Sequence, residues 1–309
     1  MEERFVTGRA VKGLGGRFEI LGDDGGTYVC RAKGALKRDG GKLAIGDRVR
    51  LRVGDTVTDD VVVDAILERK NALIRPPIAN LDRIWLVIAA KDPDFAPDTA
   101  DKMLAIAEHN RISPAVVITK CDLDPEGAKK IAGIYHLAGY PVFPVSSETG
   151  EGIENVKDHI HSCLEGGKIG AFAGASGVGK STLIGLLFPS LSRETGEISQ
   201  KTGRGRHTTR SVELLSLPDS DGFLADTPGF SLLDFERFDF FSLEELSSCF
   251  PEIALHLGRC RYVDCTHVKE GAEDCSVKRA LSEGEIAQSR HESYASLREV
   301  LLKKENTYK

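Results

Sequence analysis

The sequence of 309 residues contains no long apolar run. A membrane-spanning helix needs roughly 18 consecutive apolar residues, so we expect a protein that does not bind or cross a membrane. The first ten residues, MEERFVTGRA, also lack the apolar core of a secretory signal peptide. Internal repeats and low-complexity segments are absent as well. These absences predict a cytoplasmic, globular protein. Its length of 309 residues is enough for two or three domains.

The sequence also lacks an even set of regularly spaced cysteines. It contains seven, and three of them crowd into residues 260–275. A disulfide framework is therefore disfavoured in a chain of this length. We expect four of the cysteines to pack as small apolar side chains, namely Cys30, Cys121, Cys163 and Cys249.

Charge is distributed unevenly along the chain. The formal net charge is −6, yet residues 1–52 contain twelve Lys and Arg against seven Asp and Glu. The remaining residues are therefore strongly acidic. A basic segment on an acidic chain indicates either a phosphate-rich partner or a solvated strand surface, and the composition does not separate the two.

Three patterns of apolar residues predict three domains. Residues 1–75 consist of short apolar stretches separated by glycine-rich turns, a pattern typical of a small OB-fold-like β-barrel. Residues 76–235 alternate continuous apolar runs with amphipathic segments, which predicts an α/β domain with a doubly wound sheet. Residues 236–309 are mostly helical in pattern. There Ser282, followed by Glu285, predicts the N-cap of a terminal helix.

The clearest functional motif is GASGVGKS at residues 174–181. It fits the phosphate-binding loop G-x-x-x-x-G-K-S, and it lies between a predicted strand and a predicted helix. Backbone N–H groups of such a loop point at phosphate oxygens, the lysine reaches the β- and γ-phosphates, and the serine holds Mg²⁺. The predicted phosphate-binding residues are Gly174, Ala175, Ser176, Gly177, Val178, Gly179, Lys180, Ser181 and Thr182.

Two earlier segments predict a guanine-reading site. Thr119, Lys120, Cys121 and Asp122 follow an apolar strand. A carboxylate such as Asp122 accepts both guanine N1–H and N2–H₂, and adenine offers no such pair of donors. Guanine-reading motifs of this kind usually begin with Asn, and Thr stands in its place here. After the next apolar run, Ser146 and Ser147 resemble the loop whose backbone N–H contacts guanine O6.

A further element follows the phosphate loop. Asp226 and Gly229 fit D-x-x-G, with an aspartate near Mg²⁺ and a glycine N–H near the γ-phosphate. Residue 230, where many GTPases carry a water-orienting Gln, is Phe. In the preceding segment KTGRGRHTTR, either Thr208 or Thr209 is expected to contact Mg²⁺, and basic residues suited to RNA accompany them: Lys201, Arg204, Arg206 and Arg210.

The cysteine cluster has the composition of a structural zinc site. Cys260, Cys265, His267 and Cys275 offer three thiolates and one imidazole, which is a closed tetrahedral set for Zn²⁺. The alternative is three buried free cysteines and a surface histidine.

The motifs occur in the order of a circularly permuted GTPase: guanine reader, phosphate loop, D-x-x-G. With the N-terminal barrel and its GDRVR, the segment GRGRHTTR and the cysteine cluster, the chain resembles the RsgA family of small ribosomal subunit biogenesis GTPases. The resemblance implies a monomer that binds GTP, GDP, the small ribosomal subunit and its rRNA, and whose hydrolysis the subunit stimulates. It also implies that His207 positions the attacking water. The family's last zinc-ligand gap is usually five residues, whereas here it is seven.

Two alternatives stay open at this point. Because Phe230 cannot orient water, the chain is alternatively an RNA-binding protein that holds nucleotide without turnover. An ATP-using enzyme is the other alternative, which Asp122 disfavours.

Overall fold

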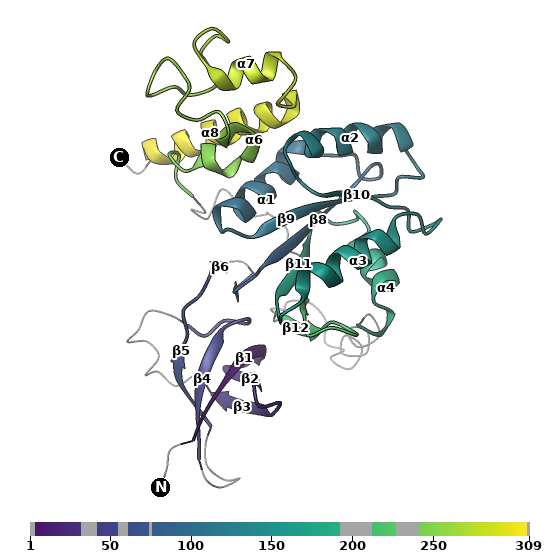
Figure 1. Cartoon of the computed structure of the whole chain (residues 1–309), viewed down its shortest axis with the longest axis vertical. Coiled ribbons are helices and arrows are strands. Elements are labelled where there is room, and N and C mark those ends of the chain that lie inside the picture. Colours follow the sequence, from purple (N-terminus) through teal and green to yellow (C-terminus); the bar gives the residue numbers. More distant parts are fainter. Residues whose placement is uncertain are drawn as a thin grey trace. The chain divides into compact units, whose positions relative to one another are not determined.

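The computed structural model describes residues 4–31, 42–54, 61–73, 76–191, 212–226 and 241–307. The chain divides into two compact units. Figure 1 shows its elements coloured from purple at the N-terminus to yellow at the C-terminus. The first contains residues 1–83, 160–171 and 188–230. The second contains residues 84–159, 172–187 and 231–309.

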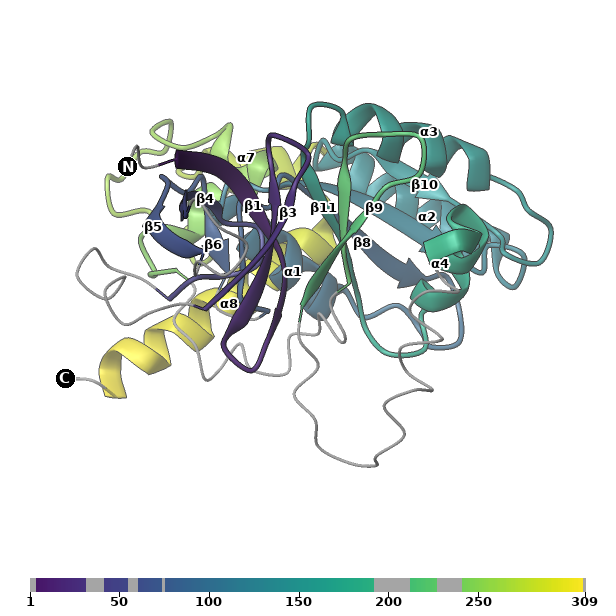
Figure 2. The same ribbon diagram turned by 90° about the horizontal axis from the view of Figure 1, so that it is seen from below.

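Five strands of the first unit form a closed circuit of pairs. They are β1 (Arg4–Leu14), β2 (Arg17–Gly22), β3 (Thr27–Arg31), β4 (Arg48–Val53) and β5 (Val62–Ile66). The pairs are β1–β2, β2–β3, β3–β5, β5–β4 and β4–β1. The long strand β1, labelled in Figure 2, takes part twice, because its first half pairs with β4 and its second half pairs with β2. This circuit is the connectivity that a closed five-stranded barrel requires.

Side chains along these strands alternate between the core and the surface, as the burial pattern of β4 shows. Val49 and Leu51 are fully buried, whereas the arginines on either side of them point outward. The core contains Ala10, Ile20, Cys30, Leu43, Val49, Leu51 and Val63. Cys30 packs there as an apolar group, and its burial raises the pKa of the thiol to about 11.

The first unit extends beyond this circuit. It includes β6 (Ala72–Leu73), β7 (Ile78–Ala79), β12 (Glu213–Ser216), β13 (Phe223–Asp226) and the start of β11 (Ile169–Ala173). Strand β1 pairs with β12 at Lys12 and Glu213, whose side chains form an ion pair. The Arg9 guanidinium stacks over the Phe223 ring at 5.0 Å from its centroid. The N-terminal strands therefore share one compact unit with β11–β13.

The second unit contains the predicted α/β arrangement. Strands β8 (Arg83–Ala89), β9 (Ser113–Thr119) and β10 (Val142–Pro144) are neighbours, and β9 and β10 run parallel. Six of the seven residues in β8 and in β9 are buried, as the continuous apolar runs predict. The accompanying helices are α1 (Pro97–His109), α2 (Pro125–Leu137), α3 (Ile153–Leu164) and α4 (Lys180–Leu187). Figure 1 shows helices on both sides of these strands.

The C-terminal segment is helical, as predicted, but its helix boundaries differ. It contains η2 (Leu246–Cys249), α6 (Pro251–Ala254), α7 (Ser276–Ser282) and α8 (Gln288–Thr307). The predicted N-cap at Ser282 is wrong, because Ser282 is the last residue of α7 and its hydroxyl donates to the Arg279 carbonyl. Gly284, with φ of 79°, turns the chain before α8 begins.

A buried cluster of charges joins α8 to the α/β elements of the same unit. Arg290 is fully buried, donates to Asp101 of α1 at 2.8 Å and contacts Glu252 of α6 at 2.7 Å. The Tyr135 hydroxyl also donates to Asp101. Burial raises the pKa of the Asp101 carboxyl despite these contacts. Among the described residues, no helix combines the length and apolar composition needed to span a membrane.

Candidate functional site

Thr119 is the last residue of β9 and is buried, with 1 % of its surface exposed. Its hydroxyl oxygen lies 2.5 Å from the carbonyl oxygen of Val178 and 3.1 Å from that of Ile88. Val178 belongs to the predicted phosphate loop, and Ile88 to the neighbouring strand β8. Thr119 therefore joins the predicted guanine-reading motif to the phosphate loop, a role that no motif in the sequence indicated.

Lys120 follows Thr119 and has a left-handed backbone conformation, with φ of 56°. This conformation turns the chain away from β9. Its ammonium group donates to the Gly177 carbonyl at 3.1 Å and to the carbonyl of Asp92. Lys120 therefore spans from the guanine-reading loop to the phosphate loop, beside Thr119. Cys121 directs its thiol back to the Ile118 carbonyl at 3.0 Å, and burial raises the pKa of this thiol.

Asp122 is held by the second predicted guanine loop. The Ser146 hydroxyl donates to Asp122 Oδ1 at 2.6 Å and accepts the backbone N–H of Thr149 at 3.1 Å. Ser146 is buried, whereas Ser147 next to it is half-buried. The sequence predicted a backbone contact to the base for this loop, but the structure adds a side-chain function: Ser146 orients the carboxylate.

The phosphate loop follows β11 and leads into α4 (Figure 1). Gly174 has φ of 145°, and a Cβ there would lie 2.2 Å from the Val87 carbonyl oxygen, so only glycine fits. Gly177 and Gly179 also have positive φ, at 81° and 93°. The segment therefore has the curled backbone that the motif predicts.

Lys180 begins α4, so the loop ends at a helix N-terminus, where partial positive charge favours anions. Its ammonium group lies 2.7 Å from the Gly174 carbonyl oxygen and 2.6 Å from that of Ala175. Burial lowers the pKa of this ammonium group. Three residues of the loop, Ala175, Ser176 and Gly177, are exposed, as are Ser181 and Thr182 in the first turn of α4.

Asp226 is the last residue of β13 and is exposed. The residue before it, Ala225, pairs with Ala171 of β11, the strand that leads into the phosphate loop. The remaining predicted residues of this part lie outside the described residues: His207, Thr208, Thr209, Gly229 and Phe230, with Lys201, Arg204, Arg206 and Arg210.

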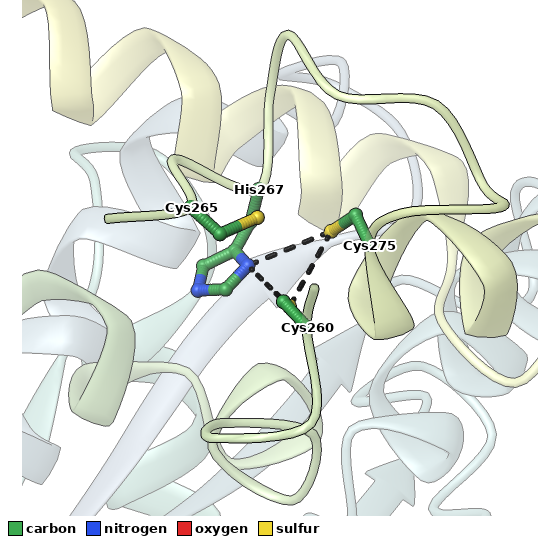
Figure 3. Close-up of side chains that lie close together, drawn as sticks. All are labelled: Cys260, Cys265, His267 and Cys275. Atoms are coloured by element: carbon green, nitrogen blue, oxygen red, sulfur yellow. Dashed lines mark hydrogen bonds between the residues drawn. The ribbon is translucent and has the colours of Figure 1, made fainter. Parts of the chain in front are cut away.

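The four predicted metal ligands come together in one cluster (Figure 3). The ligand atoms of Cys260, Cys265, His267 and Cys275 all lie within 4.8 Å of one another. His267 Nδ1 lies 3.6 Å from each of the Cys260 and Cys275 sulfurs, and these sulfurs are 3.9 Å apart. Around a tetrahedral Zn²⁺ with ordinary bond lengths, the nitrogen–sulfur distance is about 3.6 Å and the sulfur–sulfur distance is about 3.8 Å. The donor set and its spacing therefore fit one such ion.

Neighbouring groups fix the ligands in place. The Cys275 sulfur caps α7 by accepting the backbone N–H of Lys278 at 3.4 Å. From α8, His291 Nε2 contacts the His267 carbonyl at 2.7 Å. In the lengthened gap, the Glu270 carboxylate accepts both the N–H and the hydroxyl of Thr266. The two extra residues are therefore accommodated in a hydrogen-bonded loop without displacing a ligand.

A phosphate loop joined by hydrogen bonds to a predicted guanine-reading motif that precedes it in the sequence is the arrangement of a circularly permuted GTPase. The family model "RsgA GTPase" matches residues 66–236, and the model "RsgA N-terminal domain" matches residues 7–59. The chain belongs to the RsgA family of GTPases.

Similar proteins cover nearly the whole chain. A protein of Caldanaerobacter subterraneus subsp. tengcongensis named "Small ribosomal subunit biogenesis GTPase RsgA" is 39 % identical, with 98 % of this chain and 99 % of that protein covered. A protein of the same name from Halalkalibacterium halodurans is 40 % identical over 94 % and 96 % of the two chains. Among solved structures, YjeQ from Thermotoga maritima matches with a TM-score of 0.77 and 32 % identity over 97 % and 99 % of the chains. YloQ, described as a circularly permuted GTPase, also has a TM-score of 0.77, with 31 % identity over 97 % and 96 %.

Proposed function

We propose that this GTPase acts in late maturation of the small ribosomal subunit in the cytoplasm. It binds the subunit and its rRNA as a monomer, and hydrolysis of GTP to GDP and phosphate, stimulated by the subunit, releases it. The names of relatives such as the Caldanaerobacter protein support the choice of partner. The single observation that supports GTP-dependent action is the direct hydrogen bonding of Thr119 and Lys120 to the phosphate loop.

Each part of the nucleotide has a proposed binding residue. Asp122, oriented by Ser146, accepts the guanine N1–H and N2–H₂, while the stem of Lys120 covers the base. Residues 146–147 contact guanine O6 through their backbone. The loop 174–181 and Thr182 hold the phosphates, with Lys180 on the β- and γ-phosphates. Discrimination against adenine follows, because adenine would leave a desolvated carboxylate unpaired.

Two metal ions complete the proposal. Ser181, Asp226 and either Thr208 or Thr209 hold Mg²⁺ with the nucleotide, and Gly229 contacts the γ-phosphate. The cluster of Cys260, Cys265, His267 and Cys275 holds one structural Zn²⁺, which supplies folding energy and leaves no ligand position open for chemistry.

The proposed domains are an OB-fold-like barrel (1–75), the permuted GTPase domain (76–235) and the zinc-binding helical domain (236–309). The basic residues of the barrel suit rRNA, because outward arginines such as Arg48, Arg50 and Arg52 alternate with its core residues. Movement of the nucleotide-sensing switch segment on hydrolysis then changes the contacts between the chain and the subunit.

The experiment that tests the proposal is phosphate release from GTP, measured with increasing concentrations of purified small subunits. A rate that rises and saturates with subunit concentration is expected. Subunit binding without phosphate release would instead define an RNA-binding protein that holds nucleotide without turnover. Effective competition of ATP against GTP would contradict the assignment of Asp122.

The same assay tests the catalytic residue. Because Phe230 offers no polar group to the attacking water, His207 is proposed to position it when the subunit is bound. His207→Ala is expected to abolish most of the stimulated rate while GTP affinity stays unchanged. An unchanged stimulated rate would remove His207 from the mechanism.

A further inference from the structure

A pocket of about 380 Å³ lies in the second unit, away from the nucleotide loops. It is bordered by the last turns of α1 and α2, by the short helix α6 and by Ser113 and Pro114 at the start of β9. Thr119 lies at the opposite end of β9, and the predicted guanine-reading loop follows it. The pocket is therefore distinct from the site assigned to GTP.

A carboxylate without a salt-bridge partner among the described residues lines this pocket. Glu108, in the last turn of α1, forms no ion pair with any basic side chain among the described residues. Burial raises the pKa of its carboxyl, although the neighbouring Tyr140 hydroxyl and the charge of Arg290 favour the ionised form. That hydroxyl is itself buried and makes no hydrogen bond of normal geometry to a described residue. Because Arg290 is already paired with Asp101 and Glu252, the half-buried Glu108 has no cation of its own among the described residues, which at neutral pH disfavours the folded state.

The surrounding backbone adds negative potential. Helix α1 ends at His109 and α2 ends at Leu137, and residues at both ends border the pocket. The C-terminal end of a helix carries partial negative charge, so both helices favour a cation here. Glu252, the second carboxylate of the pocket, already binds Arg290 on its other side.

The rim of the pocket is apolar and accessible. Leu137 and Leu255 line it and are 51 % and 70 % exposed. Such side chains suit the methylene stem of a lysine or arginine whose charged end reaches a carboxylate. Among the described residues, no Lys, Arg or His lines the pocket, so none of them attracts an RNA phosphate there. The complementary ligand is therefore the cationic side chain of a protein.

We propose that this pocket binds a lysine or arginine side chain of a basic protein segment on the small ribosomal subunit. The identity of the partner particle rests on the proposed function, whereas the cationic chemistry rests on the pocket. Glu108 pairs with the incoming cation, and Leu137 and Leu255 pack against the flanking residues. In this way the chain contacts protein through its acidic second unit as well as RNA through its basic strands.

The first test compares Glu108→Gln with Glu283→Gln, a matched loss of charge at an exposed position at the end of α7. Affinity for purified small subunits is measured with a non-hydrolysable GTP analogue. Glu108→Gln is expected to weaken binding by about tenfold, and Glu108→Lys more, while Glu283→Gln leaves it unchanged. The thermal midpoint of free Glu108→Gln should stay equal or rise. A lower midpoint with unchanged affinity would make Glu108 a structural residue and overturn the proposal.

The second test identifies the occupant. A photo-crosslinking amino acid replaces Leu255, and the chain is irradiated while bound to small subunits. A cross-link to a lysine- or arginine-rich segment of a subunit protein is expected. A cross-link to rRNA, to a second copy of this chain or to nothing would overturn the inference. If subunits still stimulate GTP hydrolysis in that case, the proposed function stands; absence of subunit binding by the unmodified chain would overturn both.

Discussion

The hydroxyl oxygen of Thr119 lies 2.5 Å from the carbonyl oxygen of Val178, which joins the guanine-reading loop to the phosphate loop across 59 residues of sequence. Asparagine usually occupies this position of the motif, and its longer side chain has two amide N–H donors. The threonine hydroxyl has one proton, which it gives to a buried carbonyl, Val178 or Ile88. We therefore expect Thr119 to act on bound nucleotide through the geometry of the phosphate loop.

Thr119→Val removes this hydroxyl and keeps the shape of the side chain. A buried carbonyl is then left without a donor, so we expect the free energy of unfolding to fall by about 1–3 kcal/mol and GDP affinity to fall with it. Thr119→Ser, which retains the hydroxyl, should behave like the unchanged chain. Urea unfolding and titration with fluorescent GDP measure both effects. Equal behaviour of the two variants would show that the hydrogen bond is unimportant.

Asp122→Asn is expected to change base preference from GTP toward XTP. The amide offers a donor to xanthine O2 where the carboxylate offered an acceptor to guanine N2–H₂. The matched control is Asp124→Asn, two residues on, where the side chain caps α2 by accepting the N–H of Gly127. Competition binding with GTP and XTP measures the preference. Retained GTP preference in Asp122→Asn would refute the assignment of the guanine reader.

Cys275→Ser should lose bound zinc and lower the thermal midpoint, because the cluster would retain only three ligands of its tetrahedral set. Cys163→Ser, a matched change outside the cluster, should keep one zinc per chain. Metal content by mass spectrometry and thermal unfolding with and without a chelator measure these outcomes. Purified unchanged chain that is fully stable without metal would contradict a structural zinc.

Arg290→Ala should strongly destabilise the second unit. It leaves Asp101 and Glu252 buried without their cation, which typically lowers the free energy of unfolding by about 3–5 kcal/mol. Arg298→Ala, on the same helix but partly exposed, is the control. Replacing the whole triad by neutral residues should recover much of the loss. Denaturant unfolding provides the measurement, and a small effect of Arg290→Ala would show that water reaches the triad.

Some features were predictable because short spacing or local pattern determines them. The glycines of the phosphate loop, the buried runs of β8 and β9 and the clustering of the four predicted metal ligands all follow from residue type and spacing, and the structure places these residues accordingly. The start of the terminal helix was predicted wrongly, because Ser282 fits a local capping pattern equally well as the end of α7. Local patterns therefore locate motifs better than helix boundaries.

The sequence by itself determined the class of chemistry, a GTPase, because GASGVGKS and the Asp122 motif follow from residue type and spacing. The Cys/His spacing likewise predicted a metal site. Tertiary structure alone decided how distant residues cooperate. The Thr119–Val178 and Ser146–Asp122 hydrogen bonds and the burial of Arg290 against Asp101 join segments far apart in sequence. The pocket that Glu108 lines likewise brings together α1, α2, β9 and α6. No spacing rule encodes such contacts, because they depend on which faces the folded strands and helices bring together.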